Sequence, residues 1–332
     1  MKKIRIILSV LIAVNILSVC NVNAQTFQRD TSYYVTYPGT LTTRFYFSKK
    51  YATFTFPAMD NEKSIQYRPN TKLNMGIGAS YRGLSLNIGY GFGFLNNNNE
   101  KGKTTSLDLQ LHIYPHNKWA IDVLGIATKG YYLSPKGYAA PDLNSYYYRP
   151  DIKTDFICIA AYRVANGERF SYHAAMTQNE WQKKSAGSLL YGGEAYYGTI
   201  KADSALVPNE IKNKFPEEGI NSIRVFSVGP GVGYAYTAVI ANHFFITGSL
   251  IANLNLNFSS EKGTNGQKNK LAINPAAIYK AAIGYNSNTW SVSASWAGNA
   301  LWAKGTSSSD PYSLTTGNYR LTLAKKILLK KH

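Results

Sequence analysis

The chain has 332 residues and a formal net charge of +18, and it combines 26 Tyr and 27 Gly with only 16% charged residues. This composition is rich in strand formers and in the aromatic residues that gather at membrane interfaces. A basic chain could bind nucleic acid, but the lysines here gather in expected loops at 101–103, 183–184 and 262–270 instead of along a helix. We therefore expect no nucleic-acid partner, and we place these lysines near anionic lipid headgroups.

The first 24 residues have the form of a secretory signal peptide. Basic residues at positions 2, 3 and 5 precede an apolar run over 6–19, and small residues at 22–24 allow cleavage near Ala24/Gln25. After Ala24 no apolar run reaches the roughly 18 residues that a membrane helix needs. The exported chain is therefore expected to be soluble, lipid-anchored or an outer-membrane barrel.

Cys20 offers an alternative, because Leu17–Cys20 is similar to a lipoprotein processing box. The residue before such a cysteine is usually small, whereas Val19 is β-branched, so we favour cleavage after Ala24. Cys158 would then be the one cysteine left, and a single cysteine cannot form an internal disulfide.

The segment over 25–70 is irregular apart from two short alternating runs, 41–47 and 51–56, which meet at 48–50. Each run is shorter than the roughly 9–11 residues of a membrane strand. We interpret them as a hairpin that supplies either the first barrel strands or a plug in the lumen. The barrel itself is expected over 71–329.

The stretch 83–94 has the clearest strand pattern, with large apolar residues at even positions and small or polar ones at odd positions. Successive side chains of a strand point to opposite faces, so the stretch has one apolar and one polar face. The run over 72–81 alternates in the same way, and Arg82-Gly83 predicts a tight hairpin between the two. In a membrane barrel the apolar face meets lipid and the polar face lines the interior.

Similar alternation follows for the rest of the chain, including strands predicted over 105–113, 151–164 and 170–176, the last two joined by the turn residues Asn166-Gly167. Further strands are predicted over about 187–202, 222–239, 243–258, 270–285, 289–303 and 312–328. A soluble β-sandwich is the alternative, but its strands are typically about five or six residues long. We predict an all-β fold, an antiparallel transmembrane β-barrel of about 12 strands, with 10–14 possible.

Loop lengths support this fold up to one point. Turns at 82–83, 115–118 and 165–168 are short, and those at 95–103 and 133–148 are long, as in barrels whose short turns face the periplasm. The alternation fails at the link over 203–220, which falls on the short-turn side. Either a strand is miscounted or residues 209–216 form a periplasmic excursion.

Two patterns suggest chemistry. Glycines over 89–93 and 229–233 are superficially similar to nucleotide-binding loops, but no helix follows them, and curvature of a closed sheet is the better explanation. Ser171 and His173 lie at i, i+2, which would suit a lipid hydrolase on a barrel wall, although by parity they point into the lumen. With five histidines and no His/Cys cluster, we expect no metal site and no cofactor.

Charged residues also fall on the face expected to line the lumen. Seven cations against four anions would suit a weakly anion-preferring pore, or they could pair across the lumen and stiffen the wall. The predicted lumen-lining residues are Lys72, Arg82, Asp108, Asp122, Lys153, Asp155, Arg163, His173, Glu194, Arg224, Lys280 and Arg320.

Three stretches resemble the Bacteroides-type domain of unknown function family 4421: residues 67–79, the stretch through Phe94, and 169–188 with its polar run Gln178–Ser188. The resemblance covers nearly the whole mature chain, from about Asp30 to Lys326. It implies an outer-membrane β-barrel without an established activity, and it lends no catalytic residue. The basic end of the chain, 325–332, departs from the terminal aromatic that usually assists barrel assembly.

We therefore expect a single barrel of the cell outer membrane, with a structural or small-solute channel role. The alternative is a lipid-modifying outer-membrane hydrolase that uses Ser171 and His173. Expected partners are outer-membrane lipid and lipopolysaccharide and the barrel-assembly machinery.

Overall fold

The computed structural model describes residues 29–37, 39–59, 63–81, 84–95, 100–264, 266–307 and 310–329, so the predicted signal peptide lies outside the described residues. Within these ranges no helix is both long and apolar enough to cross a membrane. The described strands are β1 (Tyr34–Thr36), β2 (Thr40–Phe56), β3 (Ile65–Arg68), β4 (Leu73–Tyr81), β5 (Leu84–Tyr90), β6 (Thr105–Ile113), β7 (Trp119–Ser134), β8 (Tyr148–Val164), β9 (Glu180–Gln182), β10 (Ala186–Lys201), β11 (Ile220–Ile240), β12 (Phe244–Gly263), β13 (Gly266–Asn286), β14 (Trp290–Lys304) and β15 (Pro311–Leu328). The short helical turns are η1 (Gly93–Leu95), η2 (Pro115–Asn117), η3 (His173–Thr177) and η4 (Asn209–Lys214).

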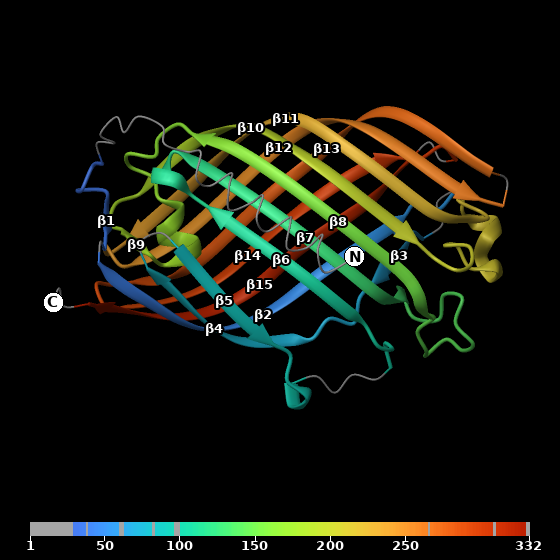
Figure 1. The fold of residues 1–332 in the computed structure, drawn as a ribbon, viewed down its shortest axis with the longest axis horizontal. Helices are drawn as coiled ribbons and strands as arrows, with labels where there is room; N and C mark the ends of the chain where they lie inside the picture. The colour runs from blue at the N-terminus through green and yellow to red at the C-terminus, as the bar shows by residue number, and fades with distance from the viewer. Residues whose placement is uncertain are drawn as a thin grey trace, which may run out of the picture.

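Ten of these strands close into one antiparallel barrel (Figure 1). Around the ring the order is β2, β3, β7, β8, β10, β11, β12, β13, β14 and β15, and β15 returns to β2 with Leu328 opposite Thr40 and Ser313 opposite Thr55. Closure pairs the sheet edges that an open sheet would expose. The predicted all-β antiparallel barrel is therefore confirmed, whereas the ring has ten strands instead of the expected twelve or so.

The strand number differs because β2 changes partner along its length. Thr42 to Lys49 pair with β4, whereas Phe54 to Phe56 pair with β3. The strand β5 continues from β4 and β6 pairs with β7, but within the described ranges no pairing joins β5 to β6. If β5 were paired with β6, the ring would pass from β2 to β7 through β4, β5 and β6 instead of through β3. It would then have twelve strands.

The expected hairpin over 41–56 is instead the single strand β2. Its pairing with β15 runs unbroken through Ser48, Lys49 and Lys50, where the sequence suggested a turn. Because a neighbouring strand holds this backbone on one side throughout, the two lysines continue the strand. The N-terminal segment therefore supplies one strand of the barrel wall.

The strand predicted over 170–176 is wrong. Residues 165–185 form one connection between β8 and β10, with a π-helical turn at η3 and the strand β9 paired with β1. The alternating Phe170, Tyr172 and Ala174 suggested a sheet face, but all three are buried, with at most 2% of their surface exposed. One strand fewer puts 203–219 at the opposite end of the barrel from the turns 114–118 and 241–243, at the same end as the long connection 135–147 (Figure 1).

The strand β12 shows how the alternation separates the two faces of the wall. Phe244, Leu250 and Leu254 point outward and are 55–60% exposed, whereas Thr247 and Asn255 point inward and are at most 1% exposed. In β5, Leu86, Ile88 and Tyr90 are likewise 64–68% exposed. The strand β5 is shorter than predicted, since it ends at Tyr90 and the chain turns at η1.

Candidate functional site

Apolar side chains fill the barrel at the end that carries the connection 203–219. Phe54 of β2 stacks on Tyr67 of β3 with ring centroids 4.8 Å apart, and Tyr131 of β7 packs edge-on against Phe54 at 5.2 Å. From the connection, Leu206 and Phe215 are at most 1% exposed, and the Tyr67 hydroxyl donates to the Leu206 carbonyl. The connection therefore closes this end with its own apolar residues.

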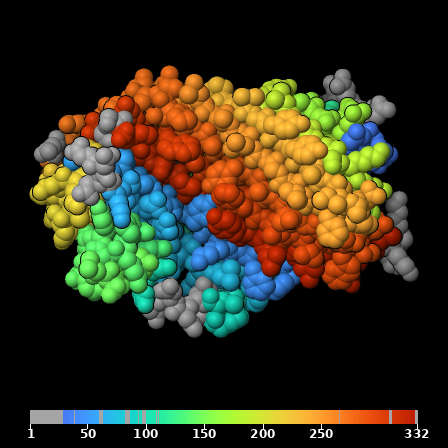
Figure 2. All heavy atoms as spheres, turned by 180° about the vertical axis from the view of Figure 1, so that it is seen from behind, coloured from blue at the N-terminus to red at the C-terminus, as the bar shows by residue number. Residues whose placement is uncertain are grey.

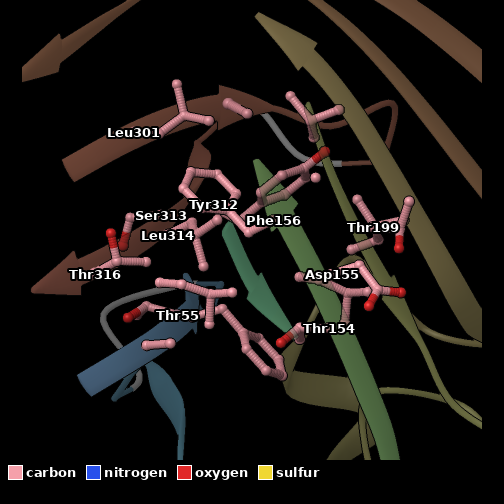
Figure 3. Close-up of a pocket in the computed structure, with 18 of the residues that line it drawn as sticks. Thr55, Thr154, Asp155, Phe156, Thr199, Leu301, Tyr312, Ser313, Leu314 and Thr316 are labelled. Carbon is pink, nitrogen blue, oxygen red and sulfur yellow. The ribbon is translucent and has the colours of Figure 1, made fainter. Parts of the chain in front are cut away.

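A small cavity remains inside this apolar layer (Figure 3). Its volume is about 30 Å³, and Phe156, Leu301, Tyr312 and Leu314 point toward it from β8, β14 and β15. A single water needs about 10–15 Å³ by the same measure. The cavity is thus far too small to act as a passage for solutes.

An ion pair crosses the interior nearer the middle of the barrel. The Lys280 ammonium of β13 donates to both carboxylate oxygens of Asp122 on β7 at 2.8 and 3.0 Å, and His112 Nδ1 lies 2.6 Å from the same carboxylate. The ammonium also lies over the rings of Tyr114 and Tyr172, 5.3 and 5.4 Å from their centroids. Asp122 and Lys280 are at most 6% exposed, so each charge depends on the other.

A second polar network surrounds Glu194 of β10. One carboxylate oxygen accepts from Asn255 Nδ2 at 2.8 Å, and the other accepts from the Tyr196 hydroxyl at 2.9 Å. Tyr162 donates to Asn253 at 2.5 Å. The inward asparagines Asn253 and Asn255 of β12 therefore hydrogen-bond to β8 and β10, three and two strands away in the wall.

The connection 165–185 closes the other end of the barrel. Tyr172 stacks on Tyr114 with centroids 5.1 Å apart, and its hydroxyl lies 2.7 Å from Ser249 Oγ. Gln178 Nε2 donates to Ser293 Oγ at 2.9 Å, so the connection contacts β12 and β14. We call residues 165–185 the plug.

Ser171 and His173 belong to the plug and have different partners. Ser171 Oγ donates to Glu180 Oε2 at 2.5 Å and is fully buried. His173 Nε2 donates to the Tyr114 carbonyl at 3.1 Å, and Nδ1 lies 3.1 Å from Thr177 Oγ1. Burial lowers the pKa of His173. The hydroxyl therefore interacts with a carboxylate and not with the imidazole that would have to activate it.

The structure places the predicted lumen-lining residues in several environments. Asp122, Glu194, Lys280 and Arg320 point inward; the Arg320 guanidinium lies over the ring of buried Tyr46, 4.6 Å from its centroid. Lys72 is exposed, Arg82 lies outside the described residues, and the side chain of Asp108 is likewise not described. His173 lies in the plug, as described above.

Lys153, Asp155, Arg163 and Arg224 lie on the outer face, which corrects their assignment to the lumen. In β8 both faces are apolar, because Phe156 and Cys158 point inward while Ile157 and Ile159 point outward. The charges therefore gave no guide to the inward face. On β8 they lie at the ends of the outer face, on either side of its apolar middle.

Arg44 is an interior cation that the sequence reasoning missed. It is 6% exposed, donates to the Thr177 carbonyl at 2.6 and 3.0 Å and to Ser80 Oγ at 2.7 Å, and so ties β2 and β4 to the plug. The sequence could have indicated this, because Arg44 precedes the apolar Phe45 and neighbouring residues of a strand point to opposite faces. That signal was obscured because 41–56 was interpreted as two short strands.

Two glutamates at the other end were also missed. Glu217, in the connection 203–219, is fully buried, and burial together with the like charge of Glu261 raises the pKa of Glu217 to about 7. Glu261 is the inward residue near the end of β12 and is 3% exposed. No periodicity applies to a loop, so Glu217 carried no sequence signal.

The outer face of the barrel is a broad apolar surface. Figure 2 shows the orange to red surface of β13–β15 beside the blue surface of β2. On this apolar surface, Trp296 Nε1 donates to the Tyr51 hydroxyl at 2.9 Å, and Tyr319 stacks on Trp296 with ring centroids 5.8 Å apart. The exposed apolar residues include Phe45, Ile77, Leu86, Ile88, Ile157, Ile159, Leu189, Val232, Leu250, Leu254, Ile273, Ile283, Leu321 and Leu323.

Within the described part of the chain, no group of three or more His, Cys, Asp or Glu side chains could hold a metal ion. Cys158 is buried inside the wall with no disulfide.

Over residues 28–324 the sequence matches the family described as a domain of unknown function, DUF4421. The chain belongs to this family. Among curated proteins none matches the sequence.

Several solved structures are similar to this DUF4421 protein at low identity. The translocator domain of the autotransporter NalP from Neisseria meningitidis is 10% identical, with 96% of this chain and 97% of that chain covered and a TM-score of 0.34. Ail of Yersinia pestis is 9% identical, covering 88% and 100%, with a TM-score of 0.19. OmpT of Vibrio cholerae is 8% identical, covering 88% and 99%, with a TM-score of 0.29. At these TM-scores the likeness carries no argument about function.

Proposed function

We propose that this protein is a structural β-barrel of the cell outer membrane whose interior is closed to solutes. The observation that carries the proposal is that both ends of the interior are filled, although a space of about 520 Å³ remains beside Ser48, Thr247 and Arg320. The apolar layer leaves a cavity of about 30 Å³, the Asp122–Lys280 pair spans the middle, and the plug occupies the far end. An open channel needs a continuous polar path, and these layers occupy the place where it would run.

The outer face supports the membrane location. Large apolar side chains that are 40–70% exposed over many neighbouring strands are far more than a soluble surface usually carries. The cluster of Tyr51, Tyr279, Trp296 and Tyr319 has the composition of an interfacial aromatic girdle. Beyond Tyr51 on β2 the next outward residues are the polar Thr53 and Thr55.

Sidedness and targeting follow from the same proposal. Short turns, with the plug and both ends of the described chain, would face the periplasm, and the longer connections such as 203–219 would face outward. Export would depend on the signal peptide with cleavage near Ala24/Gln25. The proposed partners are outer-membrane lipid, lipopolysaccharide and the barrel-assembly machinery.

Vesicle experiments test both parts of the proposal. The protein without residues 1–24, refolded into phospholipid vesicles, should resist extraction by high salt and alkaline pH, as an integral protein does. Vesicles that contain it should admit small sugars no faster than empty vesicles, whereas vesicles with a general porin swell at once. Rapid sugar entry would support the small-solute channel role instead.

The lipid-modifying hydrolase is the weaker alternative. Ser171 is fully buried beside Glu180, and His173 bonds to Tyr114 and Thr177, so neither reaches the lipid-facing surface. If a His173→Ala strain shows an altered envelope lipid composition relative to wild type, this alternative would replace the structural role.

A further inference from the structure

Glu217 is a buried carboxylate at the end of the barrel that carries the connection 203–219. It follows the buried Phe215, where the connection 203–219 turns into the barrel end before β11 begins. The side chain is 0% exposed, and neither Oε1 nor Oε2 has a hydrogen-bond partner among the described residues. Burying an ionised carboxylate without a partner is costly, so a counter-charge is expected.

Glu261 brings a second buried carboxylate to the same place. Its Oε2 accepts from the Thr306 amide at 3.0 Å and from Ser307 Oγ at 3.3 Å, which fixes the side chain against the connection between β14 and β15. Its Oε1 is buried and has no partner within the described part of the chain. One oxygen is thus held in place, and the other is left for a further ligand.

The two carboxylates lie close enough to act on each other. The segments that carry them are hydrogen-bonded to each other, because the Thr264 amide, three residues after Glu261, donates to the Gly219 carbonyl, two residues after Glu217, at 3.3 Å. Besides burial, the like charge of Glu261 also raises the pKa of Glu217. Two like charges in a buried site repel each other unless a cation or a proton lies between them. Inward oxygens of β12 nearby, Asn257 Oδ1 and Ser259 Oγ, are also buried without a hydrogen-bond partner in the described structure.

A pocket at the surface reaches Glu261 of this cluster. This pocket of about 50 Å³ at the barrel rim is lined by Glu261, Gly219, Thr264 and Thr306. The exposed Lys268 also lines this pocket. The pocket has room for an ion with a few waters.

We infer that Glu217 and Glu261 bind a calcium ion that fastens the connection 203–219 to β12 and to the connection between β14 and β15. The available donors are carboxylate, hydroxyl and amide oxygens, which are the ligands of a hard cation such as Ca²⁺, and no nitrogen or sulfur donor accompanies them in the described cluster. Two acidic side chains suffice, because Ca²⁺ completes its shell with neutral oxygens and water. The ion would supply the counter-charge for both carboxylates.

The competing explanation is a proton shared between the two carboxyl groups. A protonated Glu217 could donate to Glu261 Oε1 and satisfy the same oxygens without any metal. The two explanations differ in calcium binding at about pH 8, where the competition from protons is weak.

Calorimetry with CaCl₂ on the refolded protein in a lipopolysaccharide-free neutral detergent decides between them. We expect one equivalent of Ca²⁺ to bind at about pH 8 with a Kd in the range of about 0.1–1 mM, typical of extracellular sites. Glu217→Gln and Glu261→Gln should each weaken binding by about tenfold or more, since ligand charge sets the affinity. Glu210→Gln, which alters an exposed carboxylate of the same connection, should bind like wild type.

Terbium gives a second readout that does not depend on heat. Tb³⁺ replaces Ca²⁺ in oxygen sites, and a nearby tyrosine such as Tyr312 sensitises its luminescence, which excess Ca²⁺ should quench. Gel mobility of unheated samples verifies that each variant is folded. A folded wild-type protein that shows neither binding heat nor Ca²⁺-displaceable luminescence would overturn the calcium site and leave the shared proton, and so would variants that bind as wild type does.

Discussion

The Lys280 ammonium lies 2.8 Å from Asp122 Oδ2 across the barrel interior, although the two residues are 158 positions apart in the sequence. The pair joins β7 to β13, which are not neighbours in the wall. Both side chains are buried, so the pair links opposite sides of the barrel beneath the plug.

Removing one member of this pair should destabilise the barrel. Lys280→Met leaves the Asp122 carboxylate buried without the ammonium, with His112 Nδ1 2.6 Å away, and we expect a loss of about 3–5 kcal/mol in the free energy of unfolding. Urea unfolding in lipid vesicles, followed by tryptophan fluorescence, measures this loss. The double variant Asp122→Leu/Lys280→Met should recover most of it.

A surface ion pair provides the control. Lys212 lies 3.1 Å from Glu218 with both side chains about half exposed, so Lys212→Met should cost about 1 kcal/mol or less. If Lys280→Met has as small an effect as Lys212→Met, the interior pair does not hold the barrel together.

Tyr172 should anchor the plug mainly through its ring. Tyr172→Ala removes the stack on Tyr114 and leaves a cavity, which we expect to cost about 3–5 kcal/mol. Tyr172→Phe keeps the ring and loses the contact with Ser249, at a cost of about 1 kcal/mol. Hydrogen exchange of the plug amides distinguishes the two variants, and equal protection in both would argue against the stacking role.

Acid should loosen the plug through His173. Burial lowers the pKa of His173 below the ordinary value of 6.5. The positive charge of Arg44 lowers this pKa further, whereas the negative charge of Glu180 opposes the shift. The imidazole therefore takes up a proton more readily in the unfolded segment than in the folded one. The free energy of unfolding should be constant above pH 6.5 and should fall as the pH drops through and below that value. Amide exchange over 170–177 reports this, and His173→Gln should abolish the His-dependent part.

The apolar outer face of the barrel predicts where the folded protein tolerates a charged residue. Leu254 points outward from the middle of β12 and is 60% exposed, so Leu254→Arg should destabilise the folded protein in bilayers by about 2–4 kcal/mol. Thr55→Arg, beyond the aromatic cluster on β2, should cost about 1 kcal/mol or less. Equal costs at the two positions would contradict a membrane-spanning belt.

The sequence predicted the barrel best where one face is strictly apolar. Alternation in β12 separates Leu254 from Asn255 without ambiguity, and the structure agrees. Prediction failed where both faces are apolar, as in β8, because the alternation of residues then does not tell which face points into the barrel. It also failed at Phe170 and Tyr172, since burial inside a barrel demands the same residue types as a lipid-facing strand.

The candidate site could be predicted only in part. Asp122 and Lys280 were expected to point inward, but their pairing depends on the curvature that brings β7 opposite β13. Glu217 lies in a loop, where no pattern reports burial. The closing of the interior depends on how two connections fold back into the barrel, and local sequence patterns do not record such long-range contacts.

Single-channel recording tests the central claim most directly. The refolded protein without residues 1–24, inserted in planar bilayers in potassium chloride, should give no stepwise conductance, while its insertion is verified by a protease-protected band in parallel vesicles. Stepwise, reproducible conductance from the wild-type protein would show that the interior is an open path, and it would contradict a closed structural barrel.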